Sequence, residues 1–261
     1  FIDYIVADHS LIGAEDVQHY SEKVIWLPDS YQVNDRQRQI ADTVYTRAEC
    51  GLPEEGLVFC CFNNNYKILP SSFALWMRIL QRVPSSVLWL LEDNKAVAKN
   101  LREQARLHGV DEERLVFAKR LPPAEHLARQ QLADLFLDTW PCNAHATASD
   151  ALWAGLPVLT RSGQSFASRV AASLLRAAGL PELITHTDQA YEEKAVALAN
   201  DPQTLQALKT RLAAERLTCP LFDCERFTTH LELAYTQVMQ RHWQGLAPEH
   251  IAIAAAASAA G

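Results

Sequence analysis

Short apolar runs alternate with amphipathic segments along most of this 261-residue chain, and no other feature restricts its fold as strongly. Apolar runs such as Leu57–Phe62 and Val87–Glu92 are each followed by a segment of about 8 to 15 residues with helical spacing. Strands that alternate with helices predict a parallel, doubly wound α/β sheet. The sequence therefore predicts a Rossmann-like domain, although it has no GxGxxG motif, which disfavours an NAD-dependent dehydrogenase.

The stretch Gln131–Thr160 is the centre of this pattern. It predicts a buried strand at Ala133–Leu137, a polar loop, a short helix from Thr147, and a second strand. We expect Thr147 and Asp150 to start the helix as a capping-box-like pair. A helix N-terminus just beyond the carboxyl end of a strand offers free N–H groups to a phosphate. The alternative is that both residues only cap the helix.

The chain is expected to divide into four parts. Residues 1–45 are the end of another lobe with a connector, 46–224 the Rossmann-like domain, 225–245 a C-terminal helix, and 246–261 a disordered or frayed low-complexity tail. In the first part, Phe1–Ala7 and Glu22–Leu27 are predicted strands, and Ala14–Tyr20 is a predicted short helix. The chain does not begin with Met, so we expect it to be part of a larger protein.

Composition excludes several classes of function. The net charge is −7 and the basic residues are scattered, so neither a nucleic-acid surface nor a membrane surface is indicated. No apolar run reaches the roughly 18 residues that a membrane-spanning helix needs. The six cysteines form no CxxC pair, so we interpret them as free thiols of a cytoplasmic protein.

Polar residues follow three of the predicted strands at their carboxyl ends. They are Asn63 to Lys67 after the first strand, Leu121 to Arg129 after the third, and Cys142 to Asp150 after the fourth. Lys67 supplies a positive charge, and the helix that starts at Thr147 supplies the positive end of its dipole. His126 and Arg129 lie on the same face of a predicted helix. Together these groups favour a diphosphate with a nucleoside attached. Taken singly, each has an ordinary alternative as a solvated side chain or a turn.

Several motifs carry a family resemblance. They are YSEKVIWLPDSY (20–31), FNNNYKI (62–68), RVPSSVLWLL (82–91), LADLFLDT (132–139), CNAHATASDALWAGLPVLT (142–160) and SRVAASLL (168–175). The chain resembles the catalytic region of the O-GlcNAc transferases over nearly all of its length. The resemblance implies a GT-B glycosyltransferase with two Rossmann-like lobes, usually preceded by tetratricopeptide repeats. Such enzymes transfer N-acetylglucosamine from UDP-GlcNAc to Ser or Thr hydroxyls of intracellular proteins, with inversion and without a metal or other cofactor.

The resemblance also implies roles for individual residues of the donor-binding lobe. Lys67 would hold the diphosphate and be the catalytic group, and Asn64 would lie near the sugar or phosphate. His126, Arg129 and the backbone near Pro122 would surround the uracil, and Asp150 would bind the ribose. Thr147 and the backbone of Ala146 would contact phosphate. The implied partners are UDP-GlcNAc or UDP, a protein acceptor, and the N-terminal lobe and repeats of the same protein. We assign no general base and interpret His145 as structural.

The chain departs from the family pattern at two positions. Ala146 replaces the first of two threonines, and Pro123 stands where a lysine commonly contacts the ribose. Each lost hydrogen bond would cost about 1–3 kcal/mol of donor binding. The connector lacks the large insertion of animal members, which points to a bacterial-type member. Two alternatives stay open: transfer of fucose from GDP-fucose by a related branch, and a degenerate lobe that binds nucleotide or a partner without turnover.

Overall fold

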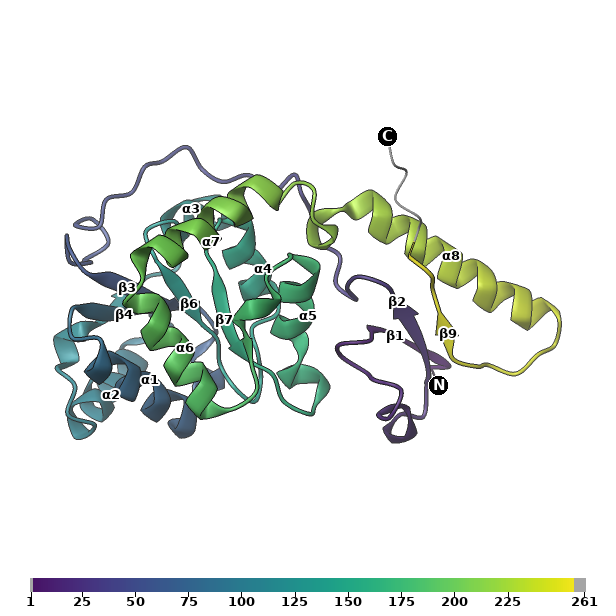
Figure 1. Cartoon of the computed structure of the whole chain (residues 1–261), viewed down its shortest axis with the longest axis horizontal. Helices are drawn as coiled ribbons and strands as arrows, with labels where there is room; N and C mark the ends of the chain where they lie inside the picture. Colours follow the sequence, from purple (N-terminus) through teal and green to yellow (C-terminus); the bar gives the residue numbers. More distant parts are fainter. Residues whose placement is uncertain (1, 256–261) are drawn as a thin grey trace.

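The computed structural model describes residues 2–255 and confirms the α/β class (Figure 1). Its larger sheet has six strands, and every neighbouring pair is parallel. In spatial order they are β5 (Leu115–Ala118), β4 (Ser86–Leu91), β3 (Leu57–Cys61), β6 (Leu135–Leu137), β7 (Val158–Arg161) and β8 (Ile184–Thr185). The order runs outward from β3 in one direction and from β6 in the other, as in doubly wound dinucleotide-binding sheets.

Helices connect these strands and cover both faces of the sheet. They are α1 (Pro70–Arg82), α2 (Lys95–Leu107), α3 (Pro123–Gln130), α4 (Ala146–Trp153), α5 (Val170–Ala177), α6 (Asp188–Ala199) and α7 (Pro202–Glu215). Because parallel crossovers are right-handed, the reversal of strand order places α1 and α2 on one face and α4 and α5 on the other. Helix α6, which follows β8, packs against α1.

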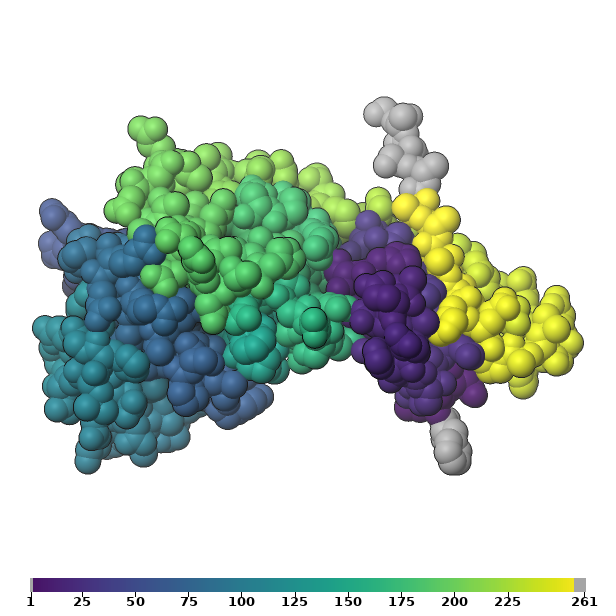
Figure 2. Space-filling model, turned by 60° about the horizontal axis from the view of Figure 1, so that its bottom comes forward, coloured from purple at the N-terminus to yellow at the C-terminus, as the bar shows by residue number. Residues whose placement is uncertain are grey.

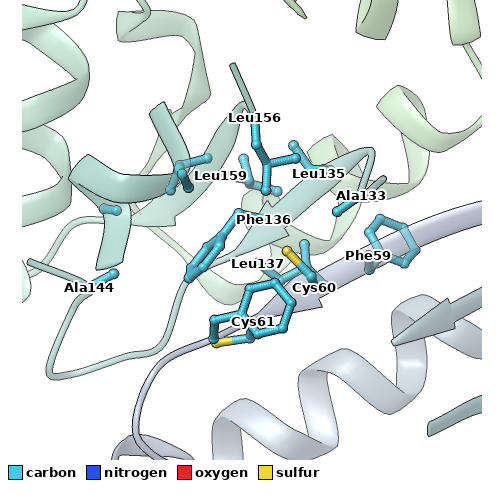
Figure 3. Packing of buried hydrophobic residues seen from close by; sticks show 14 of the residues in the cluster. Phe59, Cys60, Cys61, Ala133, Leu135, Phe136, Leu137, Ala144, Leu156 and Leu159 are labelled. Carbon is cyan, nitrogen blue, oxygen red and sulfur yellow. The ribbon is translucent and has the colours of Figure 1, made fainter. Parts of the chain in front are cut away.

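Strand β6 lies in the middle of the core. All of its residues are 0–1% exposed, and Figure 3 shows them among the buried side chains of the neighbouring strand β3, where Phe59 pairs with Leu135 and Cys60 with Phe136. Helices on both faces explain why three consecutive apolar residues are all buried, where a half-exposed strand would alternate. The six cysteines are unpaired, as predicted, and burial raises the pKa of the Cys60 and Cys61 thiols.

A second, smaller sheet lies at the other end of the molecule. It contains β1 (Tyr4–Asp8), β2 (Lys23–Leu27) and β9 (Ile251–Ala252), and α8 (Cys224–Trp243) packs against β2. The first and last described segments of the chain therefore lie side by side, as the purple and yellow regions of Figure 2 show. Among residues 2–255, no helix is both long and apolar enough to cross a membrane.

The prediction of a disordered or frayed tail is wrong for residues 251–253. Ile251 and Ile253 are 7% and 5% exposed, and they pack with Ile25 and Ala234. The backbone continues the sheet, because the Ile253 N–H donates to the carbonyl of Trp26 at 2.9 Å. The alanine-rich composition concealed an alternation that places both isoleucines on the face covered by α8. Residues 256–261 lie outside the described residues.

The short helix predicted at Ala14–Tyr20 is also wrong in extent. Only Val17–His19 forms a helical turn, of the 3₁₀ type. None of its residues is fully buried, and of the three only Val17 packs against the core, which is too little apolar contact to hold a longer helix on the protein. The connector that follows β2 runs past α4, where the side-chain nitrogen of Trp153 donates to the carbonyl of Arg38 at 3.0 Å.

Candidate functional site

The candidate site lies where the strand order reverses, at the carboxyl ends of β3 and β6. In open α/β sheets this crevice is where ligands bind. Two polar loops leave the sheet there. Residues 62–69 contain a 3₁₀ turn at Asn65–Lys67 (η2), and residues 138–145 connect β6 to α4.

Lys67 reaches from the first loop to the second. Its Nζ donates a 2.8 Å hydrogen bond to the backbone carbonyl of Asn143. Asn65 holds the turn in place, because its N–H donates to Asp93 Oδ2 at 3.2 Å and its side-chain amide to the carbonyl of Leu91 at 3.3 Å. The structure thus brings the lysine close to the loop that leads into α4, as the sequence predicts.

Helix α4 begins differently from the prediction. It starts at Ala146, and His145 occupies the N-cap position without a side-chain cap. The Thr147 hydroxyl donates to Asn63 Oδ1, and Asp150 pairs with Arg38, so these two residues do not form a capping box. The spacing of a capping box is present, but both side chains have partners from distant segments. The first backbone N–H groups of a helix have no partner within it, so they remain the anion-binding feature.

His126 and Arg129 form a connected pair one helical turn apart on α3. Arg129 is only 4% exposed, and its Nε donates to His126 Nδ1 at 3.0 Å. The guanidinium lies over the rings of Phe62 and Trp89, at 5.4 and 5.9 Å from their centroids. Burial, with help from the charges of Arg129 and Arg120, lowers the pKa of His126 to about 4. His126 is therefore neutral near pH 7, with its proton on Nε2.

Asn64 and Pro122 lie near the same edge of the sheet. The exposed Asn64 accepts a hydrogen bond from Arg120 Nη2 at 3.2 Å, a contact that the sequence did not predict. Pro122 is the N-cap of α3, and its carbonyl accepts the first helical bond from the His126 N–H at 2.9 Å. Arg120, which also pairs with Asp93, thus lies beside Asn64.

Asp150 is partly buried against the connector. Burial raises the pKa of its carboxyl, and the charge and hydrogen bond of Arg38 oppose this effect. Arg38 also lies over the ring of Trp153, at 5.9 Å from its centroid. The sequence analysis assigned no role to Arg38, because the connector has no periodic pattern that would direct one of its side chains into the site.

Asp138, the first residue after β6, is a buried carboxylate that the sequence analysis also missed. Burial raises its pKa to about 7, against hydrogen bonds from Thr160, Ala144 and Thr139 and the charge of Lys67. Burial and the charge of Lys67 also lower the pKa of His145, the N-cap residue of α4, which keeps that imidazole neutral. Within the described part of the chain, no three or more His, Cys, Asp or Glu side chains gather in a way that could hold a metal ion.

Comparison with known proteins agrees with this geometry. Residues 37–231 match the model of glycosyl transferase family 41. The chain is 40% identical to the probable UDP-N-acetylglucosamine–peptide N-acetylglucosaminyltransferase SEC of Arabidopsis thaliana, over 97% of the chain and 26% of that protein. It is 39% identical to the UDP-N-acetylglucosamine–peptide N-acetylglucosaminyltransferase of Caenorhabditis elegans, over 79% of the chain and 18% of that protein. The chain thus spans about a quarter of the length of the first relative and less than a fifth of the second.

Solved structures show the same fold. An O-GlcNAc transferase from Thermobaculum terrenum, solved as a point mutant, superposes with a TM-score of 0.83 at 30% identity, covering 93% of this chain and 46% of that one. The pneumococcal O-GlcNAc transferase GtfA, solved with UDP and GlcNAc, has a TM-score of 0.55 at 11% identity, over 91% of this chain and 45% of that one, and shows the fold alone. The six-stranded domain is thus a Rossmann-like lobe of the GT-B type, and the chain belongs to glycosyl transferase family 41.

Proposed function

We propose that this chain is the donor-binding lobe of a protein O-GlcNAc transferase of the bacterial type. The reaction would transfer N-acetylglucosamine from UDP-GlcNAc to Ser or Thr hydroxyls of proteins, with inversion and without a metal. The observation that carries the proposal is the approach of Lys67 to the loop before α4, at the point where the strand order reverses. This arrangement supplies a cation and helix N–H groups to one anionic ligand.

The diphosphate end of the site fits departure of UDP. As the bond to the anomeric carbon breaks, negative charge grows on the β-phosphate. Lys67 Nζ and the first N–H groups of α4 are already oriented, so they stabilise this charge with little reorganisation. The bond from Lys67 to the Asn143 carbonyl uses one of three ammonium donors, which leaves two for phosphate oxygens.

The nucleoside end of the site fits a neutral base. His126 presents an Nε2–H donor, because Arg129 occupies its other ring nitrogen. A donor of this kind matches a carbonyl oxygen of uracil. Asp150 would bind the ribose with the carboxylate oxygen that Arg38 leaves available.

The phosphate contacts of this chain depend strongly on Lys67. Ala146 has no hydroxyl, and the hydroxyl of Thr147 donates to Asn63. Hydroxyl donors at the start of α4 are therefore absent or engaged among the described contacts, and backbone N–H groups complement the lysine. We expect donor affinity below that of a member with two free threonine hydroxyls.

The remaining parts of the proposal concern the whole protein. The small sheet with α8 would be the end of the acceptor-side lobe, and tetratricopeptide repeats would precede the catalytic region. The acceptor would be a protein or peptide, and the general base would lie outside this chain. We propose a cytoplasmic location, which the six free cysteines support.

Calorimetric titration with UDP and then with GDP tests the proposal. An ammonium about 4 Å from a phosphate charge contributes about 4 kcal/mol at a surface-like dielectric constant of about 20. After the cost of desolvation we expect Lys67→Met to weaken UDP binding by about 2–3 kcal/mol, or roughly 30- to 150-fold. Lys99→Met is the matched control, since Lys99 is exposed on α2 and its side chain makes no hydrogen bond or ion pair among the described residues.

The outcomes separate the alternatives. UDP binding that Lys67→Met weakens and Lys99→Met preserves supports the proposal. Preference for GDP would instead favour a fucosyl donor. Absence of binding by both nucleotides at millimolar concentration would indicate a degenerate lobe, and the proposed activity would be withdrawn.

A further inference from the structure

Asp138 is buried at the centre of the site, yet the proposed chemistry gives it no role. It is 3% exposed, and no ion pair within residues 2–255 includes it. Its charge is instead met by hydrogen-bond donors. Oδ1 accepts from the N–H groups of Thr139 at 2.8 Å and Ala144 at 2.7 Å, and Oδ2 accepts from the Thr160 hydroxyl at 2.7 Å.

These contacts close the loop between β6 and α4. Thr139 and Ala144 lie at the two ends of that loop, and both donate to the same oxygen of Asp138. Asn143, whose carbonyl accepts a hydrogen bond from Lys67, is the residue before Ala144. The position of the lysine therefore depends on a loop that Asp138 holds together.

Asn63 connects Asp138 to the first turn of α4. It is 1% exposed, and its Nδ2 donates to Thr139 Oγ1 at 2.7 Å and more weakly to Asp138 Oδ1 at 3.4 Å. Its Oδ1 accepts from the Thr147 hydroxyl. The amide orientation is determined, because the Thr139 hydroxyl donates to the Cys142 carbonyl at 2.7 Å and so must accept from Asn63.

We propose that Asp138 and Asn63 form a positioning pair, in which the ionised carboxylate sets the loop before α4 and the amide fixes Thr147, so that Lys67 and the first N–H groups of α4 meet one diphosphate. This inference rests on the proposed function. Neither residue touches the substrate. Their effect is on the geometry of the groups that do.

The ionisation of Asp138 matters because a carboxylate accepts the N–H bonds of Thr139 and Ala144 more strongly than a neutral carboxyl does. A protonated carboxyl would carry its hydrogen on Oδ2 and donate to the Thr160 hydroxyl, which can also accept, so Oδ1 would keep its N–H donors but lose the negative charge that strengthens those bonds. Burial raises the pKa of Asp138 to about 7. Of the titratable groups that face it, Lys67 is cationic, whereas burial raises the pKa of Cys61 on β3 and Tyr191 on α6 and keeps both neutral.

The test compares Asn63→Ala with Ser86→Ala in the full 261-residue chain. Ser86 is an equally buried residue with its own hydrogen bonds, at the opposite end of the strands, so it reports general destabilisation. We expect Asn63→Ala to weaken UDP binding about tenfold or more and to speed amide exchange at residues 146–148. We expect Ser86→Ala, at a similar loss of Tm, to leave UDP binding within about twofold.

Hydrogen exchange of the ligand-free chain provides a second measurement that needs no nucleotide. Protection of the Thr139 and Ala144 amides, corrected for intrinsic rates, should increase as the pH rises through about 7, and Asp138→Asn should make it low at every pH. If Asn63→Ala leaves both UDP affinity and exchange at α4 unchanged, the positioning role is refuted. If the native chain does not bind UDP, the proposed function fails, and the exchange results alone decide the positioning role.

Discussion

Replacing His126 with glutamine should remove the loss of stability that this histidine causes as the pH falls. In the folded protein the pKa of His126 is lowered from 6.5 to about 4, first by burial and then by Arg129 and Arg120. A proton on Nδ1 would also face the N–H of Arg129, which now donates to that atom. The folded state therefore binds this proton much less readily than the unfolded state does.

The sign and size of the effect follow from this difference. The stabilising contribution of neutral His126 is complete above the unfolded pKa and is lost as the pH falls through 6.5 toward the folded value. Between pH 7 and pH 5 the expected loss in free energy of unfolding is about 2 kcal/mol. The imidazole is partly exposed, so solvent screening makes this an upper figure.

Urea unfolding of the native chain and His126→Gln at pH 7 and pH 5 measures the effect. The glutamine carbonyl can still accept from Arg129 but does not titrate. His186→Gln is the control, because His186 is exposed and should leave the native pH dependence unchanged. The reasoning is refuted if His126→Gln loses as much stability between the two pH values as the native chain.

Two further substitutions test the fold around the site. Ile251→Ala should lower the free energy of unfolding by about 2–3 kcal/mol by opening a cavity beneath α8, whereas Ile2→Ala, at a position 75% exposed, should change it by less than about 0.5 kcal/mol. Arg38→Met should lower the free energy of unfolding by about 1 kcal/mol, because it leaves the partly buried Asp150 without a cation. Thermal unfolding will show whether Arg36→Met, which breaks the exposed pair with Glu225, costs measurably less.

The strands and helices of the large sheet were predictable because their signals are local. Leu135 to Leu137 is a buried run that only a strand covered on both faces explains, and Pro70 and Pro123 start helices where their missing N–H has no cost. The edge of the sheet at which the polar loops gather follows from the parallel topology. The approach of Lys67 to the loop before α4 could therefore be anticipated without coordinates.

The contacts that the sequence missed join segments far apart in the chain. Thr147 and Asp150 have the spacing of a capping box, and nothing local shows that Asn63 and Arg38 will take their side chains. Asp138 belongs to the motif LADLFLDT (132–139), which can be recognised in the sequence. Its burial, however, depends on how β3, β6 and β7 assemble. Local pattern thus predicts elements, whereas the partners of polar side chains depend on tertiary packing.

The same tertiary contacts change how Ala146 should be interpreted. Taken alone, the substitution of alanine for threonine removes one hydroxyl donor and suggests a weakened site. In the structure the neighbouring Thr147 hydroxyl already serves Asn63, so it contributes order to the first turn of α4 and not a free donor. A chain organised in this way needs rigid backbone N–H groups more than additional hydroxyls, because dipoles held in place stabilise developing charge without reorganising. The proposed Asp138–Asn63 pair supplies such rigidity, and the proposed donor binding relies on that pair where Ala146 offers no hydroxyl.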